Sequence, residues 1–211
     1  MISRPKGQLF LNGVLFLTIF ALCIALVINF QPLYYFFVDQ QHLAQTVSLT
    51  RKGLITDYQH LLNYLNFPWV HKLDMTLPSS ANGLQHFADV KRLFLVDYFV
   101  MIIGVPLSVY HLHRLKKQQM LWTLIAPAQI TLTGMIFLLV LMSISFQQFF
   151  VIFHKVLFRN NDWVFDPMKD PIIDALPDEF FLACFVLFFI LFIVAMLAVI
   201  FVGKKSLKTH K

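Results

Sequence analysis

Four segments of the sequence are long and apolar enough to cross a lipid bilayer: residues 9–30, 93–110, 121–145 and 180–202. A transmembrane helix needs about 20 mostly apolar residues, because each residue adds about 1.5 Å across a hydrocarbon core of about 30 Å. The chain has 211 residues, of which 58% are hydrophobic and 13% are charged. That leaves too little polar sequence to surround four such helices in a water-soluble core. The sequence therefore predicts an all-α integral membrane protein whose four transmembrane helices form a single membrane domain.

The basic residues predict the orientation of these helices. Nine basic residues and no acidic residue lie before the first span, between the second and third, and after the fourth: Arg4, Lys6, Arg114, Lys116, Lys117, Lys204, Lys205, Lys208 and Lys211. All eleven acidic residues lie in the two other connecting segments or at Asp97. By the positive-inside rule, both termini and the 111–120 link are cytoplasmic. The net charge of +6 then reflects membrane topology, and we expect no nucleic-acid partner.

The first apolar segment is expected to remain in the mature protein as a membrane anchor. It is longer than the apolar core of a signal peptide, and no small-residue cleavage site precedes Pro32. Cys23 and Cys184 fall within predicted spans, where we expect ordinary apolar thiols.

The two remaining segments, 31–92 and 146–179, are predicted to form an extracellular, mainly helical cap. Apolar residues at helical spacing predict an amphipathic helix over about 41–66, lying on the membrane or covering the bundle: Leu54, Tyr58, Leu61, Leu62 and Leu65. A turn at 77–80 leads into a second helix, capped by Ser80 or Asn82, that runs into the second span. The third span is expected to continue as a helix to about 158, before a polar turn over 159–167.

Two of the eight histidines stand out by their position. His86 and His154 each lie on a helix that leaves the outer end of a span, so imidazoles from distant segments can meet there. Asp89 follows His86 by three residues and lies on the same side of a helix, where its carboxylate can accept the imidazole N–H. Spacing alone also allows two unrelated interfacial histidines. Because no Cys-pair or His-x-x-x-His spacing occurs in the outer segments, we expect no metal and no cofactor.

The residues around these histidines resemble the lipoprotein intramolecular transacylase (Lit) family of bacterial membrane proteins. The first block is Ser80-x-x-Gly83-x-x-His86-Phe87-x-Asp89-Val90-Lys91. The second block comprises His154, Phe158, Asn161, Asp162, Trp163, Phe165, Asp166, Pro167, Asp170, Pro171, Ile173, Leu176, Pro177 and Phe180. The resemblance implies four transmembrane helices under an extracellular cap, in the bacterial plasma membrane, with the active site where cap and membrane meet.

The resemblance also implies an activity and its residues. An acyl chain would move from the sn-2 oxygen of a diacylglyceryl-modified lipoprotein to the α-amino group of its N-terminal cysteine, giving the lyso form. His86 and His154 match the catalytic histidines of the family, with Asp89 as an orienting residue. The expected partners are therefore the diacylglyceryl lipoprotein and membrane lipid, and the oligomeric state stays open.

The chemistry suits two histidines, because a neutral imidazole can deprotonate an α-amine whose pKa is about 7.7–8 and an imidazolium can protonate the leaving oxygen. The tetrahedral intermediate is an eight-membered ring, so confinement should supply much of the catalysis. Expected substrate-binding residues are Ser80, Gly83, Phe153, Arg159, Trp163, Phe165 and Asp166. Backbone N–H groups near Ser80–Gly83, or Arg159, are candidates for stabilising the oxyanion. A capped turn at Ser80–Gly83 and a simple turn at Asp166–Pro167 are the structural alternatives.

Two other function classes are weighed against this enzyme. A non-catalytic interaction or sensor protein with an outer cap would leave both histidines individually replaceable. A small transporter fits less well, because the predicted spans hold no charge beyond Asp97 and no pair of Gly/Pro-broken helices.

Overall fold

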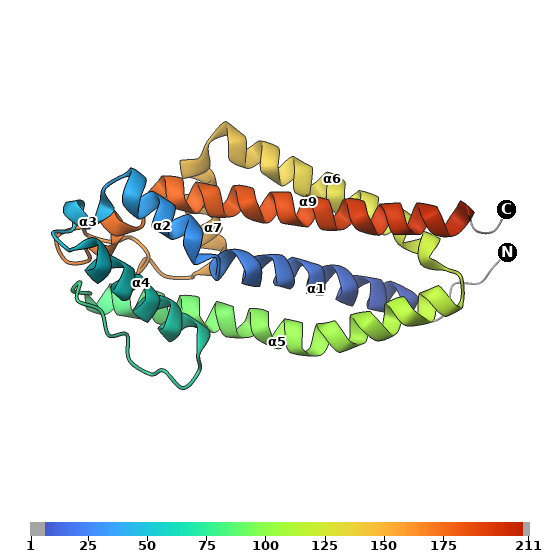
Figure 1. The fold of residues 1–211 in the computed structure, drawn as a ribbon, viewed down its shortest axis with the longest axis horizontal. Helices are drawn as coiled ribbons and strands as arrows, with labels where there is room; N and C mark the ends of the chain where they lie inside the picture. The colour runs from blue at the N-terminus through green and yellow to red at the C-terminus, as the bar shows by residue number, and fades with distance from the viewer. Residues whose placement is uncertain (1–6, 209–211) are drawn as a thin grey trace. The chain divides into compact units, whose positions relative to one another are not determined.

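The long helices of the protein coincide with its apolar segments in a computed structural model that describes residues 7–208. They are α1 (Gln8–Ile28), α5 (Ala81–Lys117), α6 (Ile125–Ile144) and α9 (Asp178–Lys208), shown in Figure 1. A short 3-10 helix, η1 (Leu121–Leu124), leads directly into α6. Helices α1, α5, η1 with α6, and α9 are each long and apolar enough to cross a membrane. No strand occurs among residues 7–208, so the predicted all-α membrane fold with four spans is confirmed.

The chain divides into two compact units. The span unit comprises the described residues of Met1–Leu26, Asp97–Ile144 and Val186–Lys211. The histidine unit comprises Val27–Val96 and Ser145–Phe185, and it contains both His86 and His154. The predicted cap segments therefore fold together as one unit, although they are far apart in the sequence.

Small and polar side chains bring the helices of the span unit together. Gly104 of α5 lies so close to Thr18 of α1 that an added Cβ would come within 3.2 Å of the Thr18 Cβ. Ser108 donates a hydrogen bond of 3.2 Å to the Thr18 hydroxyl, and His111 Nε2 donates one of 2.8 Å to Asn12 Oδ1. Small residues and interhelical hydrogen bonds are the usual means of packing helices where lipid removes the hydrophobic drive.

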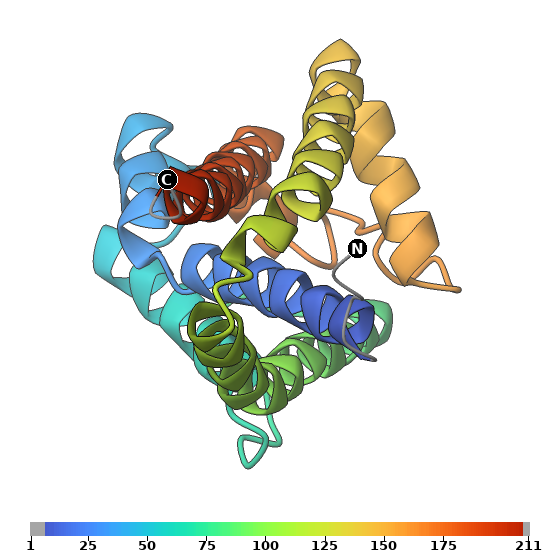
Figure 2. The ribbon, with the colours of Figure 1, turned by 90° about the vertical axis from the view of Figure 1, so that its right-hand side faces the viewer.

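The predicted basic side of the protein corresponds to one end of the span unit. The start of α1 and the ends of α5 and α9 lie at this end, which faces the viewer in Figure 2. Gln8 of α1 donates a hydrogen bond of 2.6 Å to Thr123 of η1, which joins the α5–α6 link to the start of α1. The end therefore carries Arg114, Lys116, Lys117, Lys204 and Lys205. Arg4, Lys6 and Lys211 lie outside the described residues.

The histidine unit has a core of apolar side chains drawn from several short helices. These are α2 (Gln31–Gln40), α3 (Leu43–Thr46), α4 (Arg51–Asn66) and α8 (Ile172–Ala175), together with the first turns of α5 and α9. Helix α7 (Phe146–Leu157) belongs to the same unit. Tyr34 stacks on Tyr58 with ring centroids 3.8 Å apart, and its hydroxyl donates to the carbonyl oxygen of Ala175 at 3.1 Å. Asp57 is also buried. Its carboxylate accepts the backbone N–H groups of Thr76 and Leu77 at 2.8 and 2.9 Å, and these hydrogen bonds satisfy the buried charge.

The apolar stripe predicted for residues 41–66 faces this core. Its five members, Leu54, Tyr58, Leu61, Leu62 and Leu65, are all buried within the histidine unit. The stripe of α4 therefore packs against protein, and it is not available to lie on lipid.

The boundaries of several predicted helices are wrong. Residues 41–66 form two helices, because Ser48 adopts a left-handed backbone conformation (φ 57°) and Thr50 then caps α4 by accepting the N–H of Gly53 at 3.0 Å. Helix α2 was not predicted at all. The third span does not continue through 158 as one helix, because extended backbone at Ser145 separates α6 from α7.

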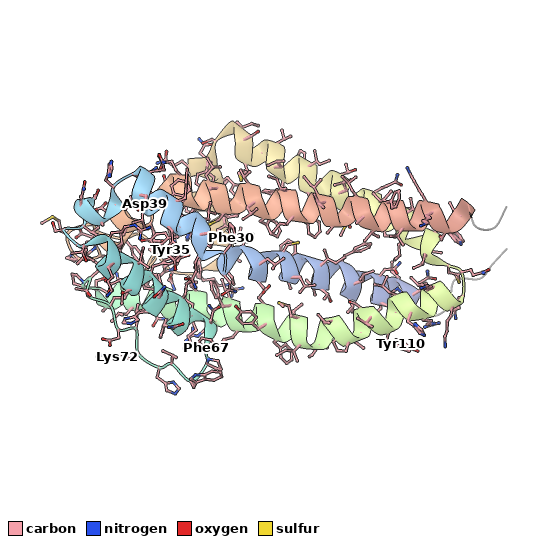
Figure 3. All side chains as sticks on the ribbon, viewed as in Figure 1. Phe30, Tyr35, Asp39, Phe67, Lys72 and Tyr110 are labelled. Carbon is pink, nitrogen blue, oxygen red and sulfur yellow. The ribbon has the colours of Figure 1, made fainter. Side chains whose placement is uncertain are left out.

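Polar contacts on the surface of the histidine unit join α2 to α4. Asp39 and Tyr35, labelled in Figure 3, lie one turn apart on α2. Asp39 accepts hydrogen bonds of 2.5 and 2.8 Å from the guanidinium of Arg51, and the Tyr35 hydroxyl accepts one of 3.1 Å from Gln59. These contacts are exposed, so the buried core makes the larger contribution to holding the two helices together.

Candidate active site

Two helices that are distant in sequence bring His86 and His154 together. His86 lies in the second turn of α5, and His154 lies near the end of α7, which begins after Ser145. Both side chains are buried, with exposed fractions of 8% and 9%. Their ring centroids are 5.9 Å apart at an interplanar angle of 36°. The predicted meeting of these two imidazoles is therefore present within the histidine unit.

Aromatic side chains enclose the histidine pair. Phe158 presents its ring to both imidazoles, at centroid distances of 4.9 Å from His86 and 5.8 Å from His154. Phe165 packs against His86 at 5.4 Å. The neighbours of His154 are Phe150 at 4.2 Å, Trp163 at 5.0 Å and Phe153 at 5.5 Å. Phe153, Trp163 and Phe165, all predicted to bind substrate, thus line the pair, where they exclude water and present apolar surface.

A backbone hydrogen bond determines the tautomer of His154. Nδ1 of its ring lies 2.8 Å from the carbonyl oxygen of Phe150, one turn earlier on α7. Because a carbonyl only accepts hydrogen bonds, Nδ1 carries the proton, and Nε2 of the neutral ring has a free lone pair. Burial lowers the pKa of His154, and the hydrogen bond to Phe150 partly opposes this shift. His154 therefore stays in its neutral, proton-accepting form near pH 7.

Asp89 does not hold the position expected for a partner of His86. Its Oδ1 accepts hydrogen bonds from Gln85 at 3.1 Å and Arg92 at 2.7 Å, and its Oδ2 accepts one of 2.9 Å from Asn160. Nδ1 of His86 is buried and has no hydrogen-bond partner within residues 7–208. Asp89 instead joins α5, which carries His86, to the turn that follows the helix of His154. It can position the two histidines relative to each other without touching either ring.

Ser80 and Gly83 form a helix cap. The Ser80 hydroxyl accepts the N–H of Gly83 at 3.0 Å, which caps α5 at the serine, the first of the two predicted positions. Ser80 also donates to Asp170 through its backbone N–H and its hydroxyl, both at 2.7 Å. An added Cβ at Gly83 would collide with the Asp170 carboxylate. Ser80 and Gly83, which the sequence predicts to bind substrate, thus form the capped turn that was their structural alternative.

Asp170 holds the start of the helix that carries His86, a role that sequence reasoning missed. Its carboxylate is 3% exposed and lies at the start of α5, where the helix dipole favours negative charge. It ties the segment before α8 to the helix that carries His86. The position belongs to the second family-like block, and this was the available signal. Nothing in local spacing shows that its partner is ninety residues away.

The other two predicted substrate-binding residues differ in their surroundings. Asp166 accepts the N–H of Met168 at 3.1 Å and pairs with Lys169 at 3.5 Å, as expected of a residue in a turn. Arg159 is exposed and lines a cavity of about 250 Å³, to which Asp89, Arg92, Phe158 and Asn160 also contribute. Within residues 7–208, no three His, Cys, Asp or Glu side chains gather closely enough to hold a metal ion.

Comparison with known proteins identifies the family. The model of the family described as lipoprotein intramolecular transacylase Lit matches residues 9–181. The structure is similar to that of the membrane-integral lipoprotein intramolecular transacylase Lit from Bacillus cereus, with a TM-score of 0.88 and 30% identity over 96% of this chain and 95% of that one. Two structures of the same protein with a single histidine replaced by arginine or alanine each give a TM-score of 0.81 at 30% identity, over 96% of this chain and 91% or 93% of theirs. A comparison with curated proteins gives no match.

The match covers most of the chain, including both helices that carry the histidine pair and the turn that follows His154. An all-helical membrane fold with four spans and a matching solved structure agree with it. The chain belongs to the lipoprotein intramolecular transacylase Lit family.

Proposed function

We propose that His86 and His154 are the catalytic residues of an O-to-N acyl transfer within one diacylglyceryl lipoprotein. One observation carries this proposal: two buried imidazoles from distant segments face each other across 5.9 Å inside a wall of aromatic rings. Burying polar rings in an apolar site costs free energy. A purely structural role therefore does not explain why two histidines occupy this position.

The reaction needs one proton removed and one returned. The α-amine nitrogen attacks the sn-2 ester carbonyl, a C–N bond forms, and the N–H proton passes to a base. The C–O bond then breaks, and the glyceryl oxygen takes up a proton to become a hydroxyl. Two imidazoles on opposite sides of the intermediate provide both transfers near neutral pH.

We assign the base to His154. Its Nδ1–H is committed to the carbonyl oxygen of Phe150, so Nε2 is the proton acceptor. The leaving oxygen takes a proton from a ring nitrogen of His86, and His86 then regains a proton from the imidazolium of His154, so both rings end neutral. His86 is therefore the proton-donating partner, and the catalyst ends the cycle in its starting state.

The aromatic wall supplies confinement. An eight-membered ring closes poorly in solution, so holding the amine next to the ester can supply a large part of the rate. Phe153, Trp163 and Phe165 offer apolar surface for acyl chains, and they leave few polar groups to compete with the reacting atoms.

We also propose that the histidine unit faces the outside of a bacterial cell. The described part of one end of the span unit carries Arg114, Lys116, Lys117, Lys204 and Lys205, which the positive-inside rule assigns to the cytoplasm. Cysteines introduced at Asp74 or Asp162 should react with an impermeant thiol reagent in whole cells, whereas Lys116→Cys should react only after lysis. The reverse pattern would invert the topology and remove this proposal.

The catalytic proposal is tested with the variants His86→Gln and His154→Gln. A general acid–base group contributes about 10²–10⁴-fold, so each variant should lose most activity. Residues that act as a unit are strongly non-additive, so the double variant should be little slower than the poorer single one. The product is an isomer of the substrate. Conversion of a diacylglyceryl lipopeptide is therefore followed by loss of its reactive amine and by fragmentation mass spectrometry.

The matched control is His60→Gln, which changes an exposed histidine of α4 in the same unit. It should stay near wild type at equal amounts of folded protein. Near-wild-type rates for both His86→Gln and His154→Gln would overturn the catalytic assignment. A non-catalytic role for the pair, as in an interaction or sensor protein, would then be the better interpretation.

A further inference from the structure

A cavity of about 250 Å³ lies next to the aromatic wall of the histidine pair. The two share Phe158, which contacts both imidazoles and lines the cavity. The other lining residues are polar or charged (Asp89, Arg92, Arg159 and Asn160) and apolar (Leu93 and Leu157). All of these residues belong to the histidine unit. The cavity therefore continues the site away from the imidazoles, with charged and polar side chains beside apolar ones.

The hydrogen-bond donors that remain free in this cavity belong to positively charged side chains. Both carboxylate oxygens of Asp89 are occupied, by Gln85, Arg92 and Asn160. Arg159 makes no ion pair within residues 7–208, and its guanidinium is exposed. A guanidinium has five N–H donors and no acceptor. The missing ligand must therefore provide acceptors, such as carbonyl oxygens or a carboxylate.

Size and charge limit what can occupy this cavity. The cavity is smaller than the roughly 300–1,000 Å³ of ordinary small-molecule sites, so it holds a short segment of a larger ligand. Methylene groups there would desolvate Arg159 and Asn160 without offering them hydrogen bonds. A peptide segment offers backbone carbonyls at every residue and fits the available donors.

We propose that this cavity binds the first residues after the modified cysteine of the lipoprotein, and that Arg159 makes it favour an acidic residue there. The inference rests on the proposed function, because that function places the cysteine amine at the histidines. The chain must leave the site from that point, and the cavity next to Phe158, with an Arg159 guanidinium that no described acidic residue pairs, accepts it. Arg159 is then a specificity-determining residue, and its charge acts on the peptide while the reacting atoms stay at the imidazoles.

The test compares three diacylglyceryl lipopeptides that differ only in a Glu, Gln or Lys two residues after the cysteine. The purified protein is assayed in a neutral detergent, and kcat/KM is obtained from loss of the reactive amine. Wild type should prefer Glu over Gln over Lys, by about two- to fivefold per step, as expected for an exposed charge pair. Arg159→Gln should flatten this order, and Arg159→Glu should reverse it.

The matched control is Lys155→Gln, which removes an exposed positive charge from α7 in the same unit and should keep the wild-type order. Equal loss of rate on all three lipopeptides in Arg159→Glu, or no change in their order, would overturn the inference. So would an Arg159 effect that depends on added anionic phospholipid and not on the peptide, because the cavity would then bind a lipid phosphate. If wild type converts none of the three, the proposed function itself fails; equal conversion of all three by wild type removes only the inference.

Discussion

The two units differ in the polar groups that they bury and in what those groups bond to. In the span unit, large apolar side chains such as Ile102 and Ile130 are 73% and 74% exposed, while Asn12, Thr18 and His111 are buried and hydrogen-bonded between helices. In the histidine unit, Tyr34 and Leu54 are fully buried. Its buried polar groups include the carboxylates of Asp57 and Asp170, which accept backbone N–H groups.

The topology proposed above accounts for this difference, because it places the spans in lipid and exposes the histidine unit to water. Lipid is as apolar as leucine, so a helix gains little by hiding apolar side chains, and close packing with polar contacts holds the bundle together. In water, burial of apolar surface is the dominant favourable contribution to folding. In the histidine unit, a polar group can then be buried only where hydrogen bonds satisfy it. Removing one partner of such a hydrogen bond should therefore destabilise the protein more in this unit than in the span unit.

The largest effect is expected for Asp57→Ala in the histidine unit. The change leaves the N–H groups of Thr76 and Leu77 buried without an acceptor, at a cost of about 1–3 kcal/mol each. Asn12→Ala breaks the interhelical bond to His111 in the span unit, where such bonds average about 0.6 kcal/mol. Thermal unfolding of the purified protein in detergent measures both. Equal destabilisation by the two variants would contradict the comparison.

A smaller loss is expected for Gly83→Ala. The added Cβ displaces the Asp170 carboxylate and weakens its bonds to Ser80, an overpacking effect of about 1–3 kcal/mol. Because this cap anchors the helix of His86, conversion of lipopeptide should fall as well.

Gly134→Ala in α6 is the matched control, because nothing lies within 4 Å of its added Cβ. It should be neutral or stabilise the protein by about 0.5–1 kcal/mol. A Gly83→Ala protein that is as stable and as active as Gly134→Ala would show that the Asp170 contact has no role.

Acidification should destabilise the histidine unit through both histidines of the pair, because burial lowers the pKa of His86 to about 4 and also lowers that of His154. Burial lowers the pKa of His154 below its usual value of about 6.5, so in mildly acidic solution the unfolded chain binds a proton that the folded chain does not. Stability from this group is therefore unchanged above about pH 6.5 and falls as the pH decreases towards the folded pKa. Thermal unfolding of wild type and His154→Gln between pH 7.5 and 5 measures the slope. An identical slope in the variant would exclude His154 as one of its sources.

The smallest effect is expected from a chelator. Proton transfer by two imidazoles needs no metal, and no cluster of metal-binding side chains occurs in the described part of the chain. EDTA should therefore leave both lipopeptide conversion and thermal stability unchanged. Activity that is lost in EDTA and restored by zinc would identify the two histidines as metal ligands instead.

The histidines were predictable, and their surroundings were not. His86 and His154 stood out because each lies just beyond the outer end of a predicted span, which hydropathy marks locally. Asp89 was assigned to His86 because residues three apart share a helix face, but its hydrogen bonds go to Gln85, Arg92 and Asn160. Spacing along a helix predicts which residues share a face of that helix. It does not predict which side chains from distant segments will donate hydrogen bonds to them.

The sequence by itself determined the four apolar helices, the uneven distribution of basic residues and the apolar stripe of α4, because lipid and water sort side chains by local periodicity. Only the tertiary structure decided that Asp170 completes the cap of α5, that Phe158 touches both imidazoles, and that α3 and α4 are separate helices. These features depend on contacts between residues up to ninety positions apart or on single backbone angles, and no local pattern of hydrophobicity encodes either.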